Sequence, residues 1–450
     1  MRRMSRPKRL LAVAVACAAA MSLTGCLAGS AEVADFTREF ADAPAVERLD
    51  LSTADNMPFT GGVGGTVYLR PDLDDAQRRA FSEDVRAFGE DLIGDASDPR
   101  YRIDLDGDGW RFPVLAEHAA NENVLDLIED YRSDPRVVSG VVRSSDYHRT
   151  VDHVSLVVAA PTDTFALFAE SEKTLPVAAR NAALTVESPG DSAVAVHVEG
   201  RPGPWLQTAR EVYDGILAAL PLRVFRASET ALTLKVPDEN DADAAATLAS
   251  SLLGGAPVDV FVQSDLVTLA PGASGATTRA LLSGLDASAQ TGLLAVWTDD
   301  RAASFRFDSR ENAGTFGAAL SDVPEAAGFS TIEVTVGPAD APSLRVTATP
   351  DDLAAHLSLA DVLAADDSVA SLSAVQGISL DLVLRTAPSE SALVSSAQAL
   401  RALSNGNERV CVDWPDDSLC FSATRAGDPA EIRDATPQKR AFLEAWNDAS

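Results

Sequence analysis

Apolar and polar positions follow two different periods along most of this chain, from about residue 61 to its end. Residues 66–70 alternate one by one, as in a strand with one buried face. The next stretch places apolar side chains three or four positions apart, the spacing of one helix face: Phe81, Val85, Phe88 and Leu92. Residues 101–105 and 110–114 return to strict alternation on either side of a short polar turn, which predicts a hairpin.

A second helical stretch and another strand follow this hairpin. The helix carries Val124, Leu125, Ile128 and Tyr131, and the strand covers residues 137–142. The resulting order, β-α-β-β-α-β, is that of a split βαβ or ferredoxin-like module. Comparable orders begin near residues 151, 231, 304 and 378. The periodicity therefore predicts several passes of one architecture, although the passes share no sequence motif.

This alternation predicts an α+β fold of mainly antiparallel sheets covered by helices. The repeated units are either βαββαβ modules or ββα units laid on larger sheets. Residues 297–301 are compatible with a tight hairpin joining two of the proposed modules, and such a hairpin favours ββα units. We expect a first α+β region over residues 61–226, with two βαββαβ-like modules, and a second over residues 227–450.

The first 60 residues follow a different pattern. Five basic residues precede an apolar run over residues 10–21, and small residues then lead to Cys26. This is the order of parts in a secretory signal, and the run is shorter than the roughly 20 residues that a membrane-spanning helix needs. Residues 26–60 are small, polar and contain proline, without sustained periodicity, so we expect a tether with at most a short helix near residues 35–40.

The sequence Leu23-Thr24-Gly25-Cys26 resembles the lipobox of bacterial lipoproteins. The resemblance covers the first 26 residues only. It implies that residues 1–25 are a signal peptide, that Cys26 becomes the first residue of the mature chain, and that its sulfur carries a lipid. Two acyl chains hold a protein at a membrane where one is marginal. The implied location is the extracytoplasmic face of the cell membrane, with the lipid as the anchor.

The charge of the chain excludes one class of partner. The formal net charge is −30, and loss of the five basic residues of the signal would change it to −35. Such a chain does not attract nucleic acid through its overall field. Only four of its 37 basic residues are lysine, and the bias toward Ala, Asp and Arg is typical of a high-GC bacterium such as an actinobacterium.

The remaining cysteines predict a disulfide. Cys17 lies in the signal and Cys26 would carry the lipid, which leaves Cys411 and Cys420. These two flank a sequence typical of a turn, with Pro415 at its second position. A hairpin centred on this turn places the two cysteines directly opposite each other, at a separation that a disulfide can span. Disulfides persist in the expected extracytoplasmic compartment; the alternatives are a reduced pair or a redox site, which the missing Cys-x-x-Cys spacing does not support.

The sharpest metal-like motif contains Asp104, Asp106 and Asp108 in Asp-Leu-Asp-Gly-Asp-Gly. It matches the start of a calcium loop, in which alternate carboxylates converge on the ion. The position of the bidentate Glu is Leu115, and the flanks alternate as strands. A hairpin whose Asp-Gly pairs supply left-handed turn geometry is therefore the favoured interpretation. Calcium is the one cofactor for which the sequence offers a candidate site.

Signatures of other chemistry are missing from the sequence. The glycine-rich residues 61–65 precede a strand, whereas a phosphate-binding loop lies between a strand and a helix. His148 and His153 have odd spacing, which places them on opposite faces of a regular strand. No zinc-binding His-Glu-x-x-His and no nucleophile motif occurs. Carboxylates are so abundant that an acid pair for glycoside cleavage would not stand out.

These observations favour a lipid-anchored envelope protein that binds another envelope protein or a ligand without catalysis. One alternative is a hydrolase of the cell wall that uses carboxylates. The other is the solute-binding lipoprotein of a transporter, a class that usually alternates helices with parallel strands in two lobes. The frequent hairpins argue against this last class.

Overall fold

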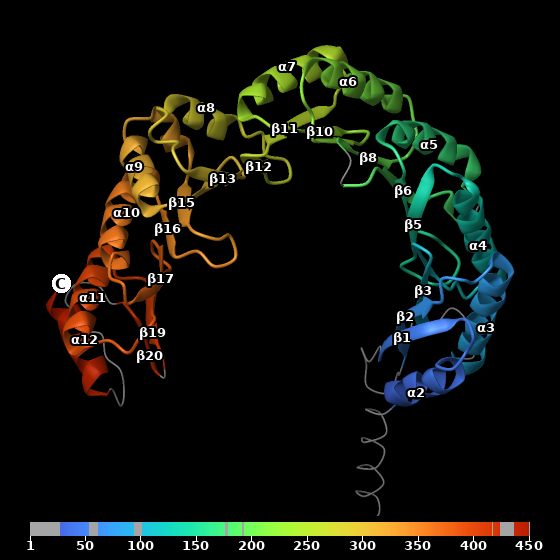
Figure 1. The fold of residues 1–450 in the computed structure, drawn as a ribbon, viewed down its shortest axis with the longest axis horizontal. Helices are drawn as coiled ribbons and strands as arrows, with labels where there is room; N and C mark the ends of the chain where they lie inside the picture. The colour runs from blue at the N-terminus through green and yellow to red at the C-terminus, as the bar shows by residue number, and fades with distance from the viewer. Residues whose placement is uncertain are drawn as a thin grey trace, which may run out of the picture. The chain divides into compact units, whose positions relative to one another are not determined.

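A computed structural model describes residues 28–53, 62–93, 101–175, 179–190, 193–415, 417–423 and 436–449 (Figure 1). The chain forms two compact units. The first contains the residues up to Gly215 together with Arg223–Leu232 and Leu252–Val258, and the second contains Ile216–Leu222, Thr233–Ser251 and the chain from Asp259 onward. The predicted boundary near residue 227 falls in the interval where the two units alternate along the chain.

The first sheet contains 11 strands and the second contains nine. The strands of the first are β1 (Val46–Thr53), β2 (Val63–Leu69), β3 (Tyr101–Gly107), β4 (Trp110–Pro113), β5 (Val137–Arg143), β6 (His153–Val158), β7 (Ala183–Glu187), β8 (Ala195–Gly200), β9 (Val224–Ala227), β10 (Ala231–Val236) and β11 (Asp259–Ser264). The strands of the second are β12 (Val267–Leu269), β13 (Leu293–Thr298), β14 (Ala302–Phe307), β15 (Thr331–Val336), β16 (Leu344–Ala348), β17 (Val369–Val375), β18 (Ser379–Leu384), β19 (Arg409–Trp414) and β20 (Asp417–Ser422).

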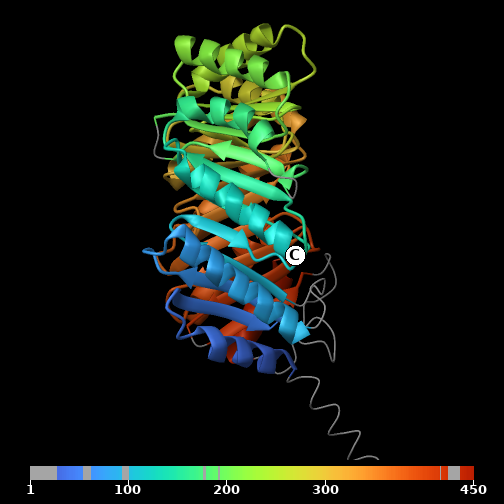
Figure 2. The same cartoon turned by 90° about the vertical axis from the view of Figure 1, so that its right-hand side faces the viewer.

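The helices alternate with pairs of strands along the chain. They are α2 (Ala28–Phe40), α3 (Asp75–Ile93), α4 (His118–Ser133), α5 (Pro161–Thr174), α6 (Trp205–Ala219), α7 (Ala242–Leu253), α8 (Ala276–Gly284), α9 (Arg310–Leu320), α10 (Pro350–Ala364), α11 (Glu390–Leu403) and α12 (Pro437–Asp448). In both sheets the strands lie side by side in chain order (Figure 2).

The direction of pairing identifies the repeated unit. Strands joined by a turn or loop without a helix pair antiparallel, as β3 does with β4 and β5 with β6. Strands joined through a helix pair parallel, as β2 does with β3 and β4 with β5. A helix that crosses back over the sheet returns the chain in its original direction, so the next strand is parallel to the last. The protein is therefore α+β and built from ββα units, and its sheets are mixed rather than mainly antiparallel.

The predicted tether is replaced by folded structure over residues 28–53. Helix α2 begins two residues after Cys26, and β1 pairs antiparallel with β2 as the first strand of the sheet. Phe36 of α2 is fully buried, with its ring centroid 5.6 Å from that of Phe88 on α3. Burying a phenylalanine contributes about 2 kcal/mol to folding. Phe40 of α2 also packs on α3, through Phe81. These two aromatic residues therefore hold α2 against α3, although the other residues of the segment are mostly polar.

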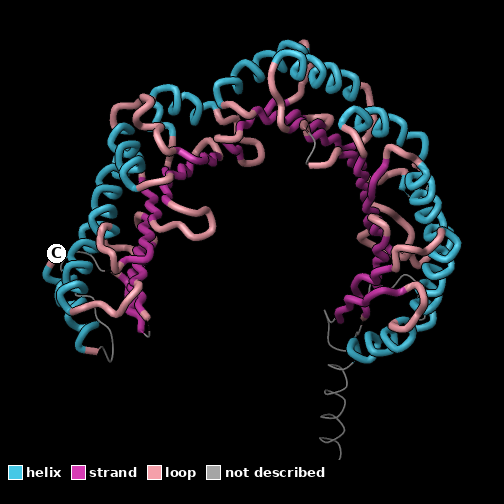
Figure 3. The backbone as a smooth tube through the Cα atoms, viewed as in Figure 1, coloured by secondary structure: helices cyan, strands magenta, loops and turns pink. Residues whose placement is uncertain are grey.

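Each sheet has one face covered by helices (Figure 3). Strand residues on that face are buried together with the apolar side of the helices. In the second unit, Phe316 of α9 lies 4.7 Å and 5.1 Å, between ring centroids, from Phe305 and Phe307 of β14. In the first unit, Phe165, Tyr213 and Phe225 form a corresponding cluster. In the second unit, stacking of the ββα repeats buries one cluster of apolar side chains, in which each repeat mainly contacts its neighbours.

Candidate functional site

The opposite face of each sheet is not covered by any described helix (Figure 3), and we call it the helix-free face. It is formed by the strand residues that alternate with the buried core positions, because successive side chains of a strand point to opposite sides. In β6, for example, Val154, Leu156 and Val158 are buried, whereas His153 and Ser155 lie on the helix-free face. The same alternation runs through the strands of the second unit.

A cluster of histidine and glutamate side chains lies on the helix-free face of the first unit. His197 on β8 lies between two carboxylates, with Nδ1 3.2 Å from Glu187 Oε2 and Nε2 3.3 Å from Glu199 Oε2. His153 on β6 has Nε2 3.3 Å from the hydroxyl of Thr185. The cluster therefore offers imidazole, carboxylate and hydroxyl groups within one part of the sheet.

Burial lowers the pKa of His153 from its ordinary value of 6.5. Arg143, its direct partner on β5, also lowers the pKa, and Glu199 acts in the opposite direction. The neutral form of His153 is thus favoured in the folded protein. From the sequence, His148 is the histidine nearest to His153. In the structure His148 lies in the loop after β5, and the histidine that shares the neighbourhood of His153 is His197. The sequence does contain one sign of this pairing: His153 and His197 each occupy a polar position in a strand whose alternate positions are apolar.

The predicted hairpin with Asp104, Asp106 and Asp108 is present as β3 and β4. Asp108 and Gly109 have φ angles of 53° and 78°, the left-handed geometry that a tight two-residue turn needs. Asp104 accepts hydrogen bonds from Arg111 Nη2 at 2.8 Å and from the Tyr147 hydroxyl at 2.9 Å. Its carboxylate therefore belongs to a polar cluster on the helix-free face.

Asp108 has different partners from Asp104. Its carboxylate accepts hydrogen bonds from Arg78 at 3.0 Å and from Arg132 at 3.3 Å. Arg78 is buried and comes from α3, and Arg132 comes from α4. Within the described part of the chain, no three His, Cys, Asp or Glu side chains are placed to hold a metal ion. The structure thus gives Asp104 and Asp108 separate arginine partners and does not bring the three aspartates together.

In the second unit, Glu333 on β15 organises a polar cluster on the helix-free face. It accepts a 2.8 Å hydrogen bond from the Ser304 hydroxyl on one side, and Thr347 lies 3.4 Å away on the other. Arg345 Nε lies 3.4 Å from the same carboxylate. Neighbouring strands place these side chains directly beside one another. Hydroxyl and charged groups therefore take the positions that apolar residues take on the covered face.

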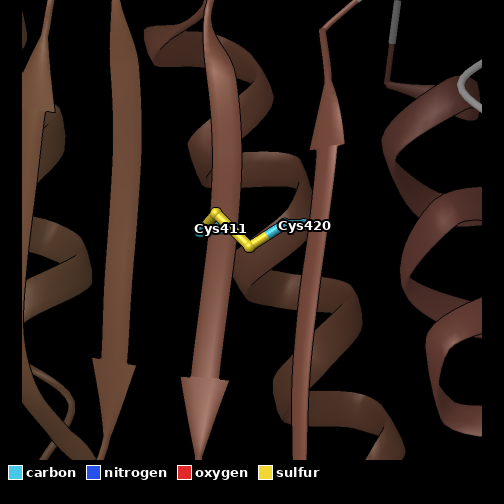
Figure 4. The surroundings of a disulfide bond; sticks show 2 residues. All are labelled: Cys411 and Cys420. Carbon is cyan, nitrogen blue, oxygen red and sulfur yellow. A yellow bond between two sulfur atoms is a disulfide. The ribbon is translucent and has the colours of Figure 1, made fainter. Parts of the chain in front are cut away.

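Cys411 and Cys420 form a disulfide across the last hairpin (Figure 4). They are direct partners in the antiparallel pair of β19 and β20, with a Cα separation of 4.2 Å. Both belong to the helix-free face, because Val410, Val412, Leu419 and Phe421 are the buried residues of these strands. The predicted disulfide is thus confirmed, and it links the final two strands of the second sheet.

Cys26, the predicted lipidation site, lies outside the described residues. Among the helices that the structure describes, none is both long enough and apolar enough to cross a membrane. No family model matches this chain, and no curated protein or solved structure matches it either. The geometry of the helix-free face and the sequence around Cys26 are therefore the basis for a functional proposal.

Proposed function

We propose that this chain is an extracytoplasmic lipoprotein, held on the cell membrane through a lipid on Cys26, and that it binds another envelope protein without catalysis. The observation that carries the binding role is the helix-free face. It extends over neighbouring strands of each sheet and presents hydrogen-bonding side chains at alternate positions. Repeat proteins use extended surfaces of this kind for binding.

The charges on the helix-free face of the second unit favour a protein partner. Three arginines and three carboxylates occupy this face on strands β14 to β19: Arg306, Arg345, Arg409, Glu333, Asp381 and Asp413. The chain as a whole carries a net charge of −30, so this balanced surface differs from the average. Mixed charges and hydroxyl groups suit a wet protein interface rather than a polyanion.

The mixed sheets give no support to a transporter's solute-binding lipoprotein. That class would need parallel strands alternating with helices in two lobes, whereas helix crossovers alternate here with antiparallel hairpins, such as β13–β14, β15–β16 and β17–β18. Among the residues that the structure describes, no arrangement favours the hydrolase alternative.

Chemical cross-linking in intact cells, followed by mass spectrometry, tests the proposal. The expected result is one dominant partner protein, with its cross-links concentrated on loops and strands that border the helix-free face. Absence of a protein adduct would contradict the adaptor role. Turnover of cell-wall polymer by the purified chain, lost on changing one acidic pair, would instead establish the hydrolase.

A further inference from the structure

A groove of about 650 Å³ lies in the first unit, between α3 and the end of α2 with the turn that follows it. Its lining is largely apolar and includes the side chains of Phe40, Leu73, Ala80, Phe81, Ala87 and Phe88. Phe40 packs edge-to-face on both Phe81 and Phe88, with ring centroids 5.7 Å and 5.3 Å apart. These aromatic contacts hold the two walls of the groove together.

The residues that α3 contributes to the groove follow helical spacing. They recur at intervals that place them along one side of the helix, at positions 77, 80, 81, 84, 87, 88 and 91. They span 14 residue steps, or about 21 Å of helix. Ala80 and Ala87 are seven residues apart on this side, and their small side chains permit a second helix to approach closely.

The acidic residues on the two sides of α3 differ in whether they form ion pairs. On the side toward α4, acidic residues are paired: Glu83 and Glu90 with Arg86 at 2.8 Å and 2.9 Å, and Asp75 with Arg78 at 2.6 Å. Asp84 and Asp91 line the groove, as does Glu39 of α2. Within the described residues these three carboxylates form no ion pair. An apolar groove is thus bordered by three carboxylates that pair with no described basic residue.

The orientation of α3 is fixed, so this side of the helix stays turned toward the groove. The Tyr101 hydroxyl donates a 2.7 Å hydrogen bond to the main-chain carbonyl of Val85. The Tyr101 ring also lies directly beneath Gly89, where an added Cβ would come within 2.5 Å of it. A rotation of α3 would break both contacts. The groove is therefore a preformed surface and not a product of helix mobility.

We propose that the α2–α3 groove binds an amphipathic basic helix of a partner protein. Apolar side chains at positions i, i+3 or i+4, and i+7 of that helix would enter the groove, as in other helix-in-groove complexes. Lysine or arginine side chains on its flanks would meet Glu39, Asp84 and Asp91. A helix of about 15 residues matches the length of the groove. A second copy of this chain is a poor occupant, because each copy carries a net charge of −30.

This surface is separate from the helix-free face, so the two proposals can fail independently. The test uses a fluorescent 15-residue peptide of leucine and lysine, with leucines at positions 1, 4, 5, 8, 11, 12 and 15. Its affinity for the chain starting at residue 26, and for the full chain, is measured by anisotropy. A peptide of the same composition with scrambled order is the control for non-specific attraction.

Three variants separate the contribution of charge from that of shape. Asp84→Asn with Asp91→Asn should weaken binding of the periodic peptide roughly tenfold, because two charge pairs are lost. Glu311→Gln with Glu444→Gln removes the same charge from exposed positions on α9 and α12 and should leave affinity unchanged. Ala87→Trp should block binding by filling the groove. The melting temperature of each variant shows that it is folded.

Three results would overturn the proposal. The scrambled peptide could bind as tightly as the periodic one, which would indicate general attraction to an acidic protein. The chain could self-associate in sedimentation experiments and lose this association with Ala87→Trp, which would make a second copy the occupant. Binding only by the chain starting at residue 26, and not by the full chain, would identify the chain's own basic N-terminal segment as the occupant.

Discussion

The buried carboxylate of Glu408 accepts a 3.0 Å hydrogen bond from the main-chain N–H of Gly377, which lies in the β17–β18 turn. Glu408 is fully buried and immediately precedes β19. Its two oxygens also accept hydrogen bonds from the Ser404 hydroxyl and from the main-chain N–H groups of Asn405, Gly406 and Asn407. The Glu408 side chain therefore joins the loop between α11 and β19 to the turn of the β17–β18 hairpin.

Glu408→Gln should lower the free energy of unfolding by about 3 kcal/mol, because an NH₂ group would face donors that need an acceptor. Denaturant unfolding of the second unit measures this change. Glu444→Gln, which alters an exposed glutamate of α12, is the matched control and should change stability by less than about 0.5 kcal/mol. Equal stability of the two variants would contradict the role given to Glu408.

The same glutamate should contribute to acid sensitivity. Burial raises the pKa of Glu408, but hydrogen bonds from Ser404 and the main chain prevail, so the pKa lies below its ordinary 4.5. The folded protein therefore binds this proton less readily than the unfolded chain. The stabilisation is fully present above pH 4.5 and is lost as the pH falls through the lower pKa that Glu408 has in the folded protein. Glu408→Gln should flatten the stability profile in that acidic range, as measured by melting temperature against pH.

The disulfide should stabilise the last hairpin. Cys411 and Cys420 enclose a short loop, for which the chain-entropy model gives about 2.6 kcal/mol. Reduction, or the double change Cys411→Ser with Cys420→Ser, should lower the melting temperature. Thiol counting on the unreduced, denatured mature chain provides the direct check. Two reactive thiols from these positions would contradict the disulfide.

His153 should make the protein less stable at mildly acidic pH. Its pKa is lower in the folded protein than the ordinary 6.5, chiefly through burial. The unfolded chain therefore binds the proton more readily, and stability falls as the pH drops below 6.5. His153→Asn should reduce this loss between pH 7 and pH 5, whereas Ser155→Asn, on the same face of β6, removes no titratable group and should behave as the wild type does. Thermal melts at the two pH values measure both effects, and identical slopes in all three proteins would refute the assignment.

Cys26→Ser should release the protein from the membrane or leave its signal unprocessed, because lipid attachment needs the sulfur. Cell fractionation with an antibody against the second unit measures the distribution. Two acyl chains contribute about 0.8 kcal/mol for each buried CH₂, so the wild type should remain with the membrane after washing. Unchanged membrane retention of Cys26→Ser would contradict the lipoprotein assignment.

The sequence alone predicts those parts of the structure that depend on residues close together along the chain. The β3–β4 hairpin followed from alternation around Asp-Gly-Asp-Gly, and the pairing of Cys411 with Cys420 followed from their equal distance to a turn. The α+β class followed from the change of period between strands and helices. In each case the deciding residues lie within about 20 positions of one another.

Long-range relationships could not be predicted in this way. Helix α2 is held by Phe36 and Phe40 against residues about 40 to 65 positions later, so its sequence alone looked like a tether. Nor does any local motif place His197 between Glu187 and Glu199, or surround Glu408 with main-chain donors. These arrangements depend on which strands and loops become neighbours, and this is decided by the packing of whole units.

The proposal that the helix-free face binds a partner protein is tested most directly by placing a photo-cross-linking amino acid at two positions in intact cells. One is Ser373, on the helix-free face of β17, and the other is Val362, which is 69% exposed on α10. We predict a specific protein adduct from position 373 and none from position 362. An adduct from position 362 alone would contradict the assignment of the helix-free face as the binding surface.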